Sequence, residues 1–595
     1  MSESDQSQTP EYDVVIVGGG VAGAVIAHKL SRATKLVLIL EAGTSDAMDP
    51  ANYRKYLDTY YTMGGTRNLP NGPYPHNPDA LSPNDATNAP YYVQPNQPNF
   101  LSDYLRMLGG STLHWQGTSL RMVPNDFRMQ STYGKGVDWP VTYDELEPGY
   151  REAEREIGVS ADVEDQRIFG VWFPEGYVYP MKKMPQSIVD KFFDEKLSGA
   201  TVPLYGGEYP LRVISIPVGR NSTPNPAYDH GRGYLPISAV GDRDSGNRCQ
   251  GNSNCLPLCP VQAKYNALKT IAAARRAGKV DIRSQCVASR LLIDPGSGRI
   301  TAVEYKRYAD PGKAVWTTET VTGKIIVLAA NAIQNAVLML ASQVSDSSGQ
   351  LGRNLMDHPY LVFFGLAPRP VWPFRGPDTT SGVESLRDGK FREKHASFRA
   401  SLGNWGWSGE PRTSVLALLA QQQFGSTFRC QLRDRLNRMV KFGAMLEQLP
   451  DPSNRVTIDP AHTDALGNYL PVLSYGYADY TLDGAMAVAE TVWPAITQRT
   501  GIDDQTSTIV PGGSQMVSYQ GRNMYLGGSG HVVGTHRMGR SRKDSVVDSD
   551  LRSWSHPNLY AVGAGSMVTI GTANPTLTVV ALAFRAADSI LAELL

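Results

Sequence analysis

A histidine near the end of the chain has both the chemistry and the setting of a general base. His531 lies in the glycine-rich segment 528–539, which reads GSGHVVGTHRMG. An imidazole titrates near neutral pH, so it can remove a proton from a hydroxyl group. His536 follows five residues later and need not point the same way. We therefore interpret His536 as a structural residue or a cofactor contact.

Three of the five cysteines lie within eleven residues, at Cys249, Cys255 and Cys259. Thiolates at this C-x5-C-x3-C spacing, followed by proline and separated by small or turn-forming residues, can wrap around one compact centre. Zinc usually takes four ligands in paired short spacings, which this segment lacks, so an iron-sulfur cluster fits the pattern better. A three-iron cluster needs only these three ligands, whereas a four-iron cluster would also need Cys286 or Cys430.

The N-terminal segment contains the elements that would place a nucleotide cofactor. An apolar strand at 14–17 leads into GGGVAG, an apolar helical pattern follows, and a second strand ends on Glu41. In a dinucleotide-binding βαβ unit, Gly18 permits the tight turn and Gly20 lets the backbone approach a pyrophosphate. Gly23 allows the helix to pack closely on the strand, and Glu41 accepts hydrogen bonds from ribose hydroxyl groups. The register of all four elements predicts such a unit.

Small and hydroxyl-bearing residues at later places could make further contacts with the same cofactor, because they allow close backbone approach or donate hydrogen bonds. The expected contacts are Gly110 and Ser111 in the segment LGGSTLHW, Ala330 at the end of strand 321–330, Gly565 after the strand at 558–562, and Thr576 at the start of the last helix.

Together these segments resemble the glucose-methanol-choline (GMC) oxidoreductases, flavoproteins with an FAD domain and a separate substrate domain. Segment 528–539 is similar to the family's His-x-x-Gly-Thr-x-x-Met-Gly motif. The turn after strand 321–330 is similar to the family's Ala-Ala-Gly-Ala-Ile motif, with Asn331 in place of glycine. Segment 352–359, GRNLMDHP, also resembles a family element. Within it we interpret Asp357 and His358 as a turn before a His-Pro bond rather than as a catalytic dyad.

The resemblance assigns roles to several of these residues. It implies that His531 is the catalytic base and that Asn574 faces it across the substrate oxygen, although the Asn-Pro pair by itself is typical of a helix cap. It also places the N-terminus of the last helix at the flavin, where it would stabilise negative charge. The His114-Trp115 pair is similar to that of pyranose oxidases, in which the histidine is bound covalently to FAD. An unattached His114 packed beside the ring is the alternative.

The cysteine segment is similar to the FAD/iron-sulfur catalytic subunits of bacterial sugar and polyol dehydrogenases in the same family, of the glucose, glucoside 3-, sorbitol or gluconate dehydrogenase type. In these relatives a 3Fe-4S cluster passes electrons from the flavin to an external acceptor. The resemblance therefore implies a sugar or glycoside substrate, a cytochrome c acceptor, and a small companion subunit that carries the export signal.

Composition excludes some functions and bounds the location. The 595 residues include 57 basic and 57 acidic side chains, which gives no overall attraction to nucleic acid. No apolar run reaches the length of a membrane span, and the polar segment 1–11 does not read as a signal peptide. Because the resemblance implies an exported companion subunit, we expect the protein to act on the periplasmic side of a membrane. The alternative is that it stays in the cytoplasm.

The pattern of strands, helices and loops predicts an α/β protein, and the resemblance implies a Rossmann-like FAD domain and an α+β substrate domain. We expect the FAD domain to comprise residues 1–42, 101–140, 246–345 and 525–595, and the substrate domain residues 141–245 and 346–524. Residues 43–100 are expected to form a lid or partner surface. Within the substrate domain we expect a strand at 414–420 and a basic helix over 428–448.

The sequence thus predicts an FAD-dependent dehydrogenase that oxidises a sugar hydroxyl by hydride transfer and passes the electrons through an iron-sulfur cluster to an acceptor such as cytochrome c. Two alternatives stay open. One is a pyranose-type oxidase that reduces oxygen, and the other is a non-catalytic electron-transfer or zinc-stabilised scaffold protein.

Overall fold

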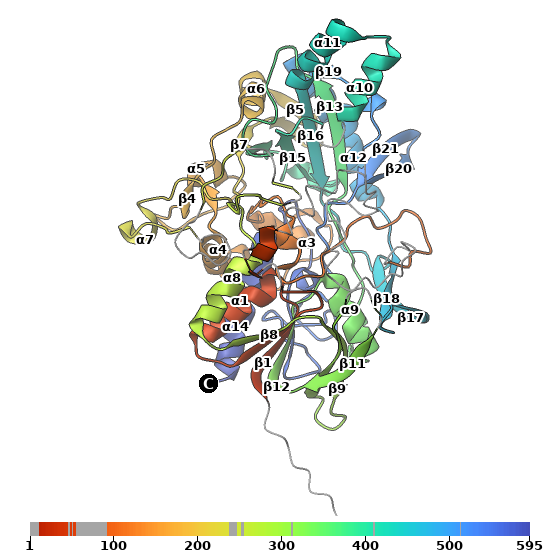
Figure 1. Ribbon diagram of the computed structural model, residues 1–595. Coiled ribbons are helices and arrows are strands. Elements are labelled where there is room, and N and C mark those ends of the chain that lie inside the picture. Colours follow the sequence, from red (N-terminus) through yellow and green to blue (C-terminus); the bar gives the residue numbers. More distant parts are fainter. Residues whose placement is uncertain are drawn as a thin grey trace, which may run out of the picture.

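The computed structural model describes residues 11–45, 48–49, 51–54, 92–236, 247–251, 255–256, 258–310, 313, 315–407, 411–511 and 513–595. Two sheets organise them, a parallel one in the lower half of Figure 1 and a larger antiparallel one in the upper half. Most of the lid or partner surface expected over residues 43–100 lies outside the described residues. No described helix is both long and apolar enough to cross a membrane.

The parallel sheet is built from segments far apart in the sequence. Its strand order is β22-β12-β1-β2-β8, with β22 at Leu559–Ala561, β12 at Gly323–Leu328, β1 at Tyr12–Val17, β2 at Val37–Leu40 and β8 at Val280–Arg283. Both faces are covered, which explains the continuous aliphatic runs of β1 and β2. Helices α1 (Val21–Arg32), α8 (Ala267–Ala277) and α14 (Thr576–Glu593) lie side by side against it (Figure 1).

An antiparallel sheet and one helix lie across the parallel sheet from these three helices (Figure 1). The sheet has the order β11-β10-β9, with β9 at Cys286–Ile293, β10 at Ile300–Tyr308 and β11 at Trp316–Val321, and the helix is α9 at Ala332–Ala341. The βαβ unit predicted at the N-terminus and the α/β fold class are both confirmed.

The larger sheet separates an apolar core from a cavity. Its order is β20-β21-β13-β16-β15-β14-β7, with β20 at Ser514–Tyr519, β21 at Arg522–Gly527, β13 at Tyr360–Leu366, β16 at Met439–Leu446, β15 at Phe398–Gly403, β14 at Ser381–Val383 and β7 at Val213–Ser215, while β19 at Asp503–Asp504 pairs with β13. Side chains alternate between the two faces of a strand. Phe363 and Phe442 accordingly pack on Trp493 of α13 (Trp493–Thr500), while Tyr360 and Lys441 point into the cavity.

Helix α4, at Tyr143–Ile157, begins at the predicted cap. Thr142 Oγ1 accepts a hydrogen bond from Glu145 N at 3.2 Å, and the Glu145 carboxylate accepts one from Thr142 N at 2.7 Å. The helix packs on α14, where the hydroxyl groups of Tyr150 and Thr578 are 2.9 Å apart. This contact supports the helix whose N-terminus reaches the cavity.

Two expectations for residues 414–448 were wrong. Residues 414–420 belong to helix α10 (Pro411–Ala420), because proline suits the first turn of a helix and leucine and alanine favour its interior. The basic helix is real but ends early: α11 spans Gly425–Arg438, and β16 follows at once. Pairing of β16 with both β13 and β15 overrides the helical periodicity of the sequence.

Candidate active site

A cavity of about 1340 Å³ lies between the two large sheets. Its wall combines the β1–α1 turn, the short helix η2 (Gly110–Leu113), the end of β12, the start of α14 and the pocket-facing side of the antiparallel sheet. Pockets that hold one drug-sized ligand measure about 300–1,000 Å³. The cavity therefore has room for a large cofactor together with a substrate.

One end of the cavity is walled by backbone at very close approach. Gly18, with φ of +104°, passes so near the end of β12 that a Cβ on it would lie 2.6 Å from Ala330 Cα. A Cβ on Gly110 would lie 3.1 Å from Gly20 Cα, whereas one on Gly20 would meet no atom within 4 Å. Gly109 N donates to Gly19 O at 2.9 Å and joins the two turns. Only residues without bulky side chains can form this wall.

Glu41 directly follows β2 at the same wall. Its Oε2 accepts a hydrogen bond from Gly19 N and its Oε1 one from Gly43 N, each at 2.9 Å. Burial raises the pKa of Glu41, and these backbone donors oppose the shift. Each carboxylate oxygen can accept more than one hydrogen bond, so both can still receive a ribose hydroxyl. The glycine wall, this carboxylate and the size of the cavity fit FAD.

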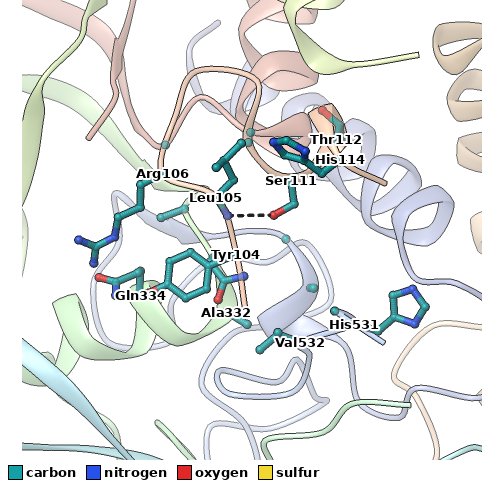
Figure 2. Close-up of a pocket in the computed structure, with 18 of the residues that line it drawn as sticks. Tyr104, Leu105, Arg106, Ser111, Thr112, His114, Ala332, Gln334, His531 and Val532 are labelled. Atoms are coloured by element: carbon teal, nitrogen blue, oxygen red, sulfur yellow. Dashed lines mark hydrogen bonds between the residues drawn. The ribbon is translucent and has the colours of Figure 1, made fainter. Parts of the chain in front are cut away.

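The segment that carries Ser111 and His114 lies over the cavity, as Figure 2 shows. Leu105 N donates to Ser111 Oγ at 3.3 Å, and His114 N donates to Ser111 O at 3.1 Å, which closes η2. The His114 side chain is buried and lines the cavity. This is a suitable position for a flavin contact, whether covalent or not.

His531 and Asn574 meet in the cavity. Asn574 Nδ2 lies 3.1 Å from His531 Nε2, and Asn574 Oδ1 accepts a hydrogen bond of 2.8 Å from Arg399 Nη1 on β15. Helix α14 takes Pro575 as its N-cap and has no side-chain cap bond. Asn574 therefore does not cap the helix, which was the reading favoured by the Asn-Pro pair alone.

Asp357 fixes the backbone that carries His531. Its Oδ1 accepts from His358 N at 2.7 Å and His531 N at 3.0 Å, and its Oδ2 accepts from Ser529 N at 3.0 Å and from the Ser102 hydroxyl. Asp357 does form the predicted turn with His358. Nothing in the residue pattern indicated that Asp357 also holds a segment more than 170 residues away.

The His358 side chain also reaches His531, a contact that sequence reasoning missed. Their Nδ1 atoms are 2.8 Å apart, and the rings meet edge to face at 88° with centroids 5.0 Å apart. Burial lowers the pKa of His358 to about 3. Burial, followed by the neighbouring His358 and Arg399, holds the pKa of His531 well below its usual value. Both imidazoles are therefore neutral at pH 7.

Three residues singled out from the sequence lie beside the cavity rather than in its wall. A Cβ on Gly23 would come within 2.2 Å of Gly18 O, so this glycine serves helix packing. Gly565 leaves space for His536, because a Cβ there would lie 2.1 Å from His536 Nε2. His536 in turn lies 3.1 Å from Asn335 Nδ2, which also donates to backbone carbonyls at the ends of β12 and β22. Of its two interpretations, His536 fits the structural one.

The far end of the cavity is polar and aromatic. The pocket face of the antiparallel sheet contributes Tyr360, Ser401 and Lys441, and the ammonium group of Lys441 lies 4.8 Å from the centre of the Trp405 ring. Burial raises the pKa of Tyr360, while a hydrogen bond with Ser401 lowers it. Hydroxyl, ammonium and amide groups beside an aromatic face can bind a polyhydroxylated ligand.

The cysteine segment adjoins the cofactor end of the cavity. Leu256 lines the cavity, and Lys264 Nζ donates to Cys255 O at 2.6 Å and also to Trp115 O. Within the described residues, no set of three or more His, Cys, Asp or Glu side chains is arranged to hold a metal ion. Residues 252–254 and 257 of the segment lie outside them.

Two buried basic side chains nevertheless lie near the three thiols. Arg220 and Lys264 are almost fully buried, and burial lowers the pKa of Lys264 to about 8 while the nearby thiols raise it. Arg220 is paired with Asp378 and faces all three cysteines. An anionic group at the thiols would be stabilised by these charges.

Models of the GMC oxidoreductase family match residues 232–360 and 450–583. The chain is similar to the fructose dehydrogenase large subunit of Gluconobacter japonicus, with 30% identity over 99% of both chains. It is also similar to the gluconate 2-dehydrogenase flavoprotein of Pantoea cypripedii, with 22% identity over 98% of this chain and 94% of the relative.

The fold is shared with pyridoxine 4-oxidase from Mesorbium loti, which matches with a TM-score of 0.58 and 18% identity over 97% of this chain and 99% of that structure. The fold, the cavity and the full-length sequence similarity all indicate the same family. The chain therefore belongs to the GMC oxidoreductase family, as an FAD-dependent oxidoreductase that acts on CH-OH donors.

Proposed function

We propose that the protein is a sugar dehydrogenase in which His531 removes the hydroxyl proton of the substrate. The observation that carries this proposal is the meeting of His531 Nε2 and Asn574 Nδ2, 3.1 Å apart, in the cavity that the glycine wall and Glu41 also line. FAD, when bound, supplies the acceptor for the hydride of the alcohol carbon. His531 would take the proton, and Asn574 would orient the substrate oxygen by a hydrogen bond.

The proposed contacts to FAD come from several segments. Gly18, Gly20, Gly110 and Ala330 would approach it through backbone, while Glu41, Ser111 and His114 would contact it through side chains. The start of α14 at Thr576 would face negative charge on the ring system. Gly23 and Gly565 would support these contacts by packing.

A sugar or glycoside is the substrate class that the far end of the cavity favours. Tyr360, Ser401 and Lys441 offer hydrogen bonds to hydroxyl groups, and Trp405 offers an aromatic face on which the apolar side of a sugar ring can pack. The names of the fructose and gluconate dehydrogenase relatives point the same way.

Anaerobic titration of the holoenzyme with a panel of sugars tests this function. Sugars that are substrates should bleach the flavin absorbance, and simple alcohols should do so far less well at equal concentration. Failure of every sugar, with bleaching by non-sugar alcohols, would refute the substrate class but leave the oxidoreductase chemistry in place.

We further propose that Cys249, Cys255 and Cys259 hold a 3Fe-4S cluster through which electrons pass to an external acceptor such as cytochrome c. Three observations support it: the three-thiol spacing, the buried Arg220 and Lys264 beside the thiols, and the link from Cys255 through Lys264 to Trp115 at the cavity. The proposal includes a small companion subunit that carries the export signal and places the enzyme at the periplasmic face of a membrane.

Assays for iron and acid-labile sulfide in the purified holoenzyme decide between a cluster and a zinc-stabilised loop. Near three irons per FAD are expected for the three-iron form. Fast oxygen consumption with sugar, without iron, would instead identify the oxidase alternative.

A further inference from the structure

His358 forms the middle link of a hydrogen-bonded chain that ends at the proposed base. His358 Nε2 lies 2.9 Å from the carbonyl oxygen of Gly571, and His358 Nδ1 lies 2.8 Å from His531 Nδ1. The His358 side chain is fully buried, so water does not compete for either nitrogen. Each nitrogen of this ring therefore has a defined partner.

The Gly571 carbonyl, at one end of this hydrogen-bonded chain, fixes which atom donates in each hydrogen bond. A carbonyl oxygen can only accept, so His358 Nε2 must carry its proton. Because a neutral imidazole has one proton, His358 Nδ1 is an acceptor. His531 must then donate from Nδ1, which leaves the lone pair of His531 on Nε2.

The contacts of Asn574, at the other end of the hydrogen-bonded chain, independently place the lone pair of His531 on Nε2. The guanidinium of Arg399 can only donate, so the amide of Asn574 must turn Oδ1 toward Arg399 Nη1, at 2.8 Å. Its NH2 group then faces His531 Nε2, at 3.1 Å, and an NH2 group needs an acceptor there. Arg399 is itself held by Glu384, which accepts from its Nε and Nη2 at 2.9 and 2.7 Å.

Gly571, whose carbonyl begins the hydrogen-bonded chain, has a constrained backbone. Its φ is +57°, and a Cβ on it would lie 2.7 Å from the carboxylate of Asp126. A larger residue could not take this conformation without displacing Asp126, so the carbonyl that faces His358 is held in place.

We propose that His358 is a positioning residue that sets the tautomer of His531, so that the lone pair of His531 is on Nε2, the nitrogen on the Asn574 side, where the substrate hydroxyl would bind. The inference rests on the proposed role of His531 as the base. When the O–H bond of the alcohol breaks, its proton moves to His531 Nε2, and His531 Nδ1 keeps the proton that it donates to His358. The resulting imidazolium has an acceptor, His358 Nδ1, at hydrogen-bond distance.

If His358 served only to fill space, the effect of its replacement would depend on the volume of the new side chain. Any side chain of similar volume would then serve, whatever its hydrogen-bonding groups. Asparagine places its carbonyl oxygen near the Nδ1 position of histidine and can accept from His531, whereas phenylalanine fills the ring volume and accepts nothing.

The experiment compares His358→Asn and His358→Phe with the parent holoenzyme, using fructose under anaerobic conditions and following the rate of flavin reduction at saturating sugar. His358→Phe should be slower by about 10–100-fold, the range found when the partner that orients a metal-bound imidazole is lost, with KM nearly unchanged. His358→Asn should recover most of the rate. Equal rates for the two variants at full FAD content would overturn the proposal.

A measurement on the parent holoenzyme without substrate tests the same inference if a His358 variant fails to fold. Nitrogen NMR of the parent holoenzyme, labelled with 15N-histidine and assigned through His531→Ala, should show His531 protonated on Nδ1 alone. A proton on Nε2 would overturn the inference even if every kinetic variant were lost. If His531→Ala reduces at the parent rate, the proposed function fails instead, while the NMR result still reports the tautomer.

Discussion

The hydroxyl group of Tyr360 occupies the space that a side chain at residue 443 would need. A Cβ on Gly443 would lie 1.7 Å from Tyr360 Oη, although the partner of Gly443 on β13 is Val362. The Tyr360 ring therefore crosses the neighbouring strand diagonally inside the cavity. A glycine on a central strand is explained here by the side chain that lies across it.

Gly443→Ala should move the Tyr360 ring and weaken substrate binding. We expect a loss of about 1–3 kcal/mol in the free energy of unfolding, the usual cost of overpacking, together with a raised KM. Thermal unfolding and steady-state kinetics measure the two effects. In a Tyr360→Ala background the same substitution should cost much less, and an equal cost in both backgrounds would show that Tyr360 is not the obstacle.

His531→Ala should leave FAD bound and slow flavin reduction by about 10² or more, because a positioned acid-base group is lost. Stopped-flow absorbance under anaerobic conditions gives the rate. His462→Ala is the matched control, since His462 is exposed on β17 (Arg455–Thr463). A parent-like rate in His531→Ala would rule out His531 as the base.

The rate of flavin reduction should be insensitive to pH around 6.5. His531 acts when neutral, and it becomes protonated only below its pKa, which burial holds well below the usual value of 6.5. The acid limb of the profile should therefore lie below pH 6.5. A limb centred at 6.5 or higher would mean that the base is exposed to solvent or is another group.

His114→Ala should change the visible absorption spectrum of the bound flavin, because the buried ring lines the cavity beside Ser111. Acid precipitation of the parent decides the nature of the contact. Yellow colour in the pellet would establish covalent attachment, and colour only in the supernatant would exclude it. An unchanged spectrum in the variant would remove His114 from the flavin environment.

Cys255→Ser should preserve flavin reduction by sugar and abolish electron transfer to cytochrome c, if the three thiols hold the proposed cluster. Parallel assays with cytochrome c and with sugar alone separate the two steps. Cys430→Ser is the control, because Cys430 is exposed on α11. Cytochrome c reduction at the parent rate in Cys255→Ser would mean that the thiols serve structure alone.

The parts of the fold that depend on local spacing could be predicted from the sequence. The turn at Gly18 and Glu41, directly after the second strand, belong to one βαβ unit, where each residue has a fixed function in the geometry. The glycines of this unit are required where backbone segments approach closely, and these segments are near one another in the sequence.

The groups around His531 could not be found in this way. His358 is 173 residues from His531 in the sequence, and Arg399 is 175 residues from Asn574. Neither contact leaves a periodic pattern, because each depends on how the two sheets face one another. The resemblance of segment 352–359 to a family element was the signal that could have singled out His358.

The strand order of the parallel sheet has a consequence for biosynthesis. Strands β1 and β2 are made first, but β22 at Leu559–Ala561 completes the sheet from the other end of the chain. At about 5–20 residues per second, a ribosome needs about half a minute to two minutes to add the intervening residues. Within that time β2 first waits for β8 and β1 for β12, and the apolar edge of β12 then waits for β22. A nascent chain stalled before Thr576 would be a natural client for chaperones and should be unable to retain flavin.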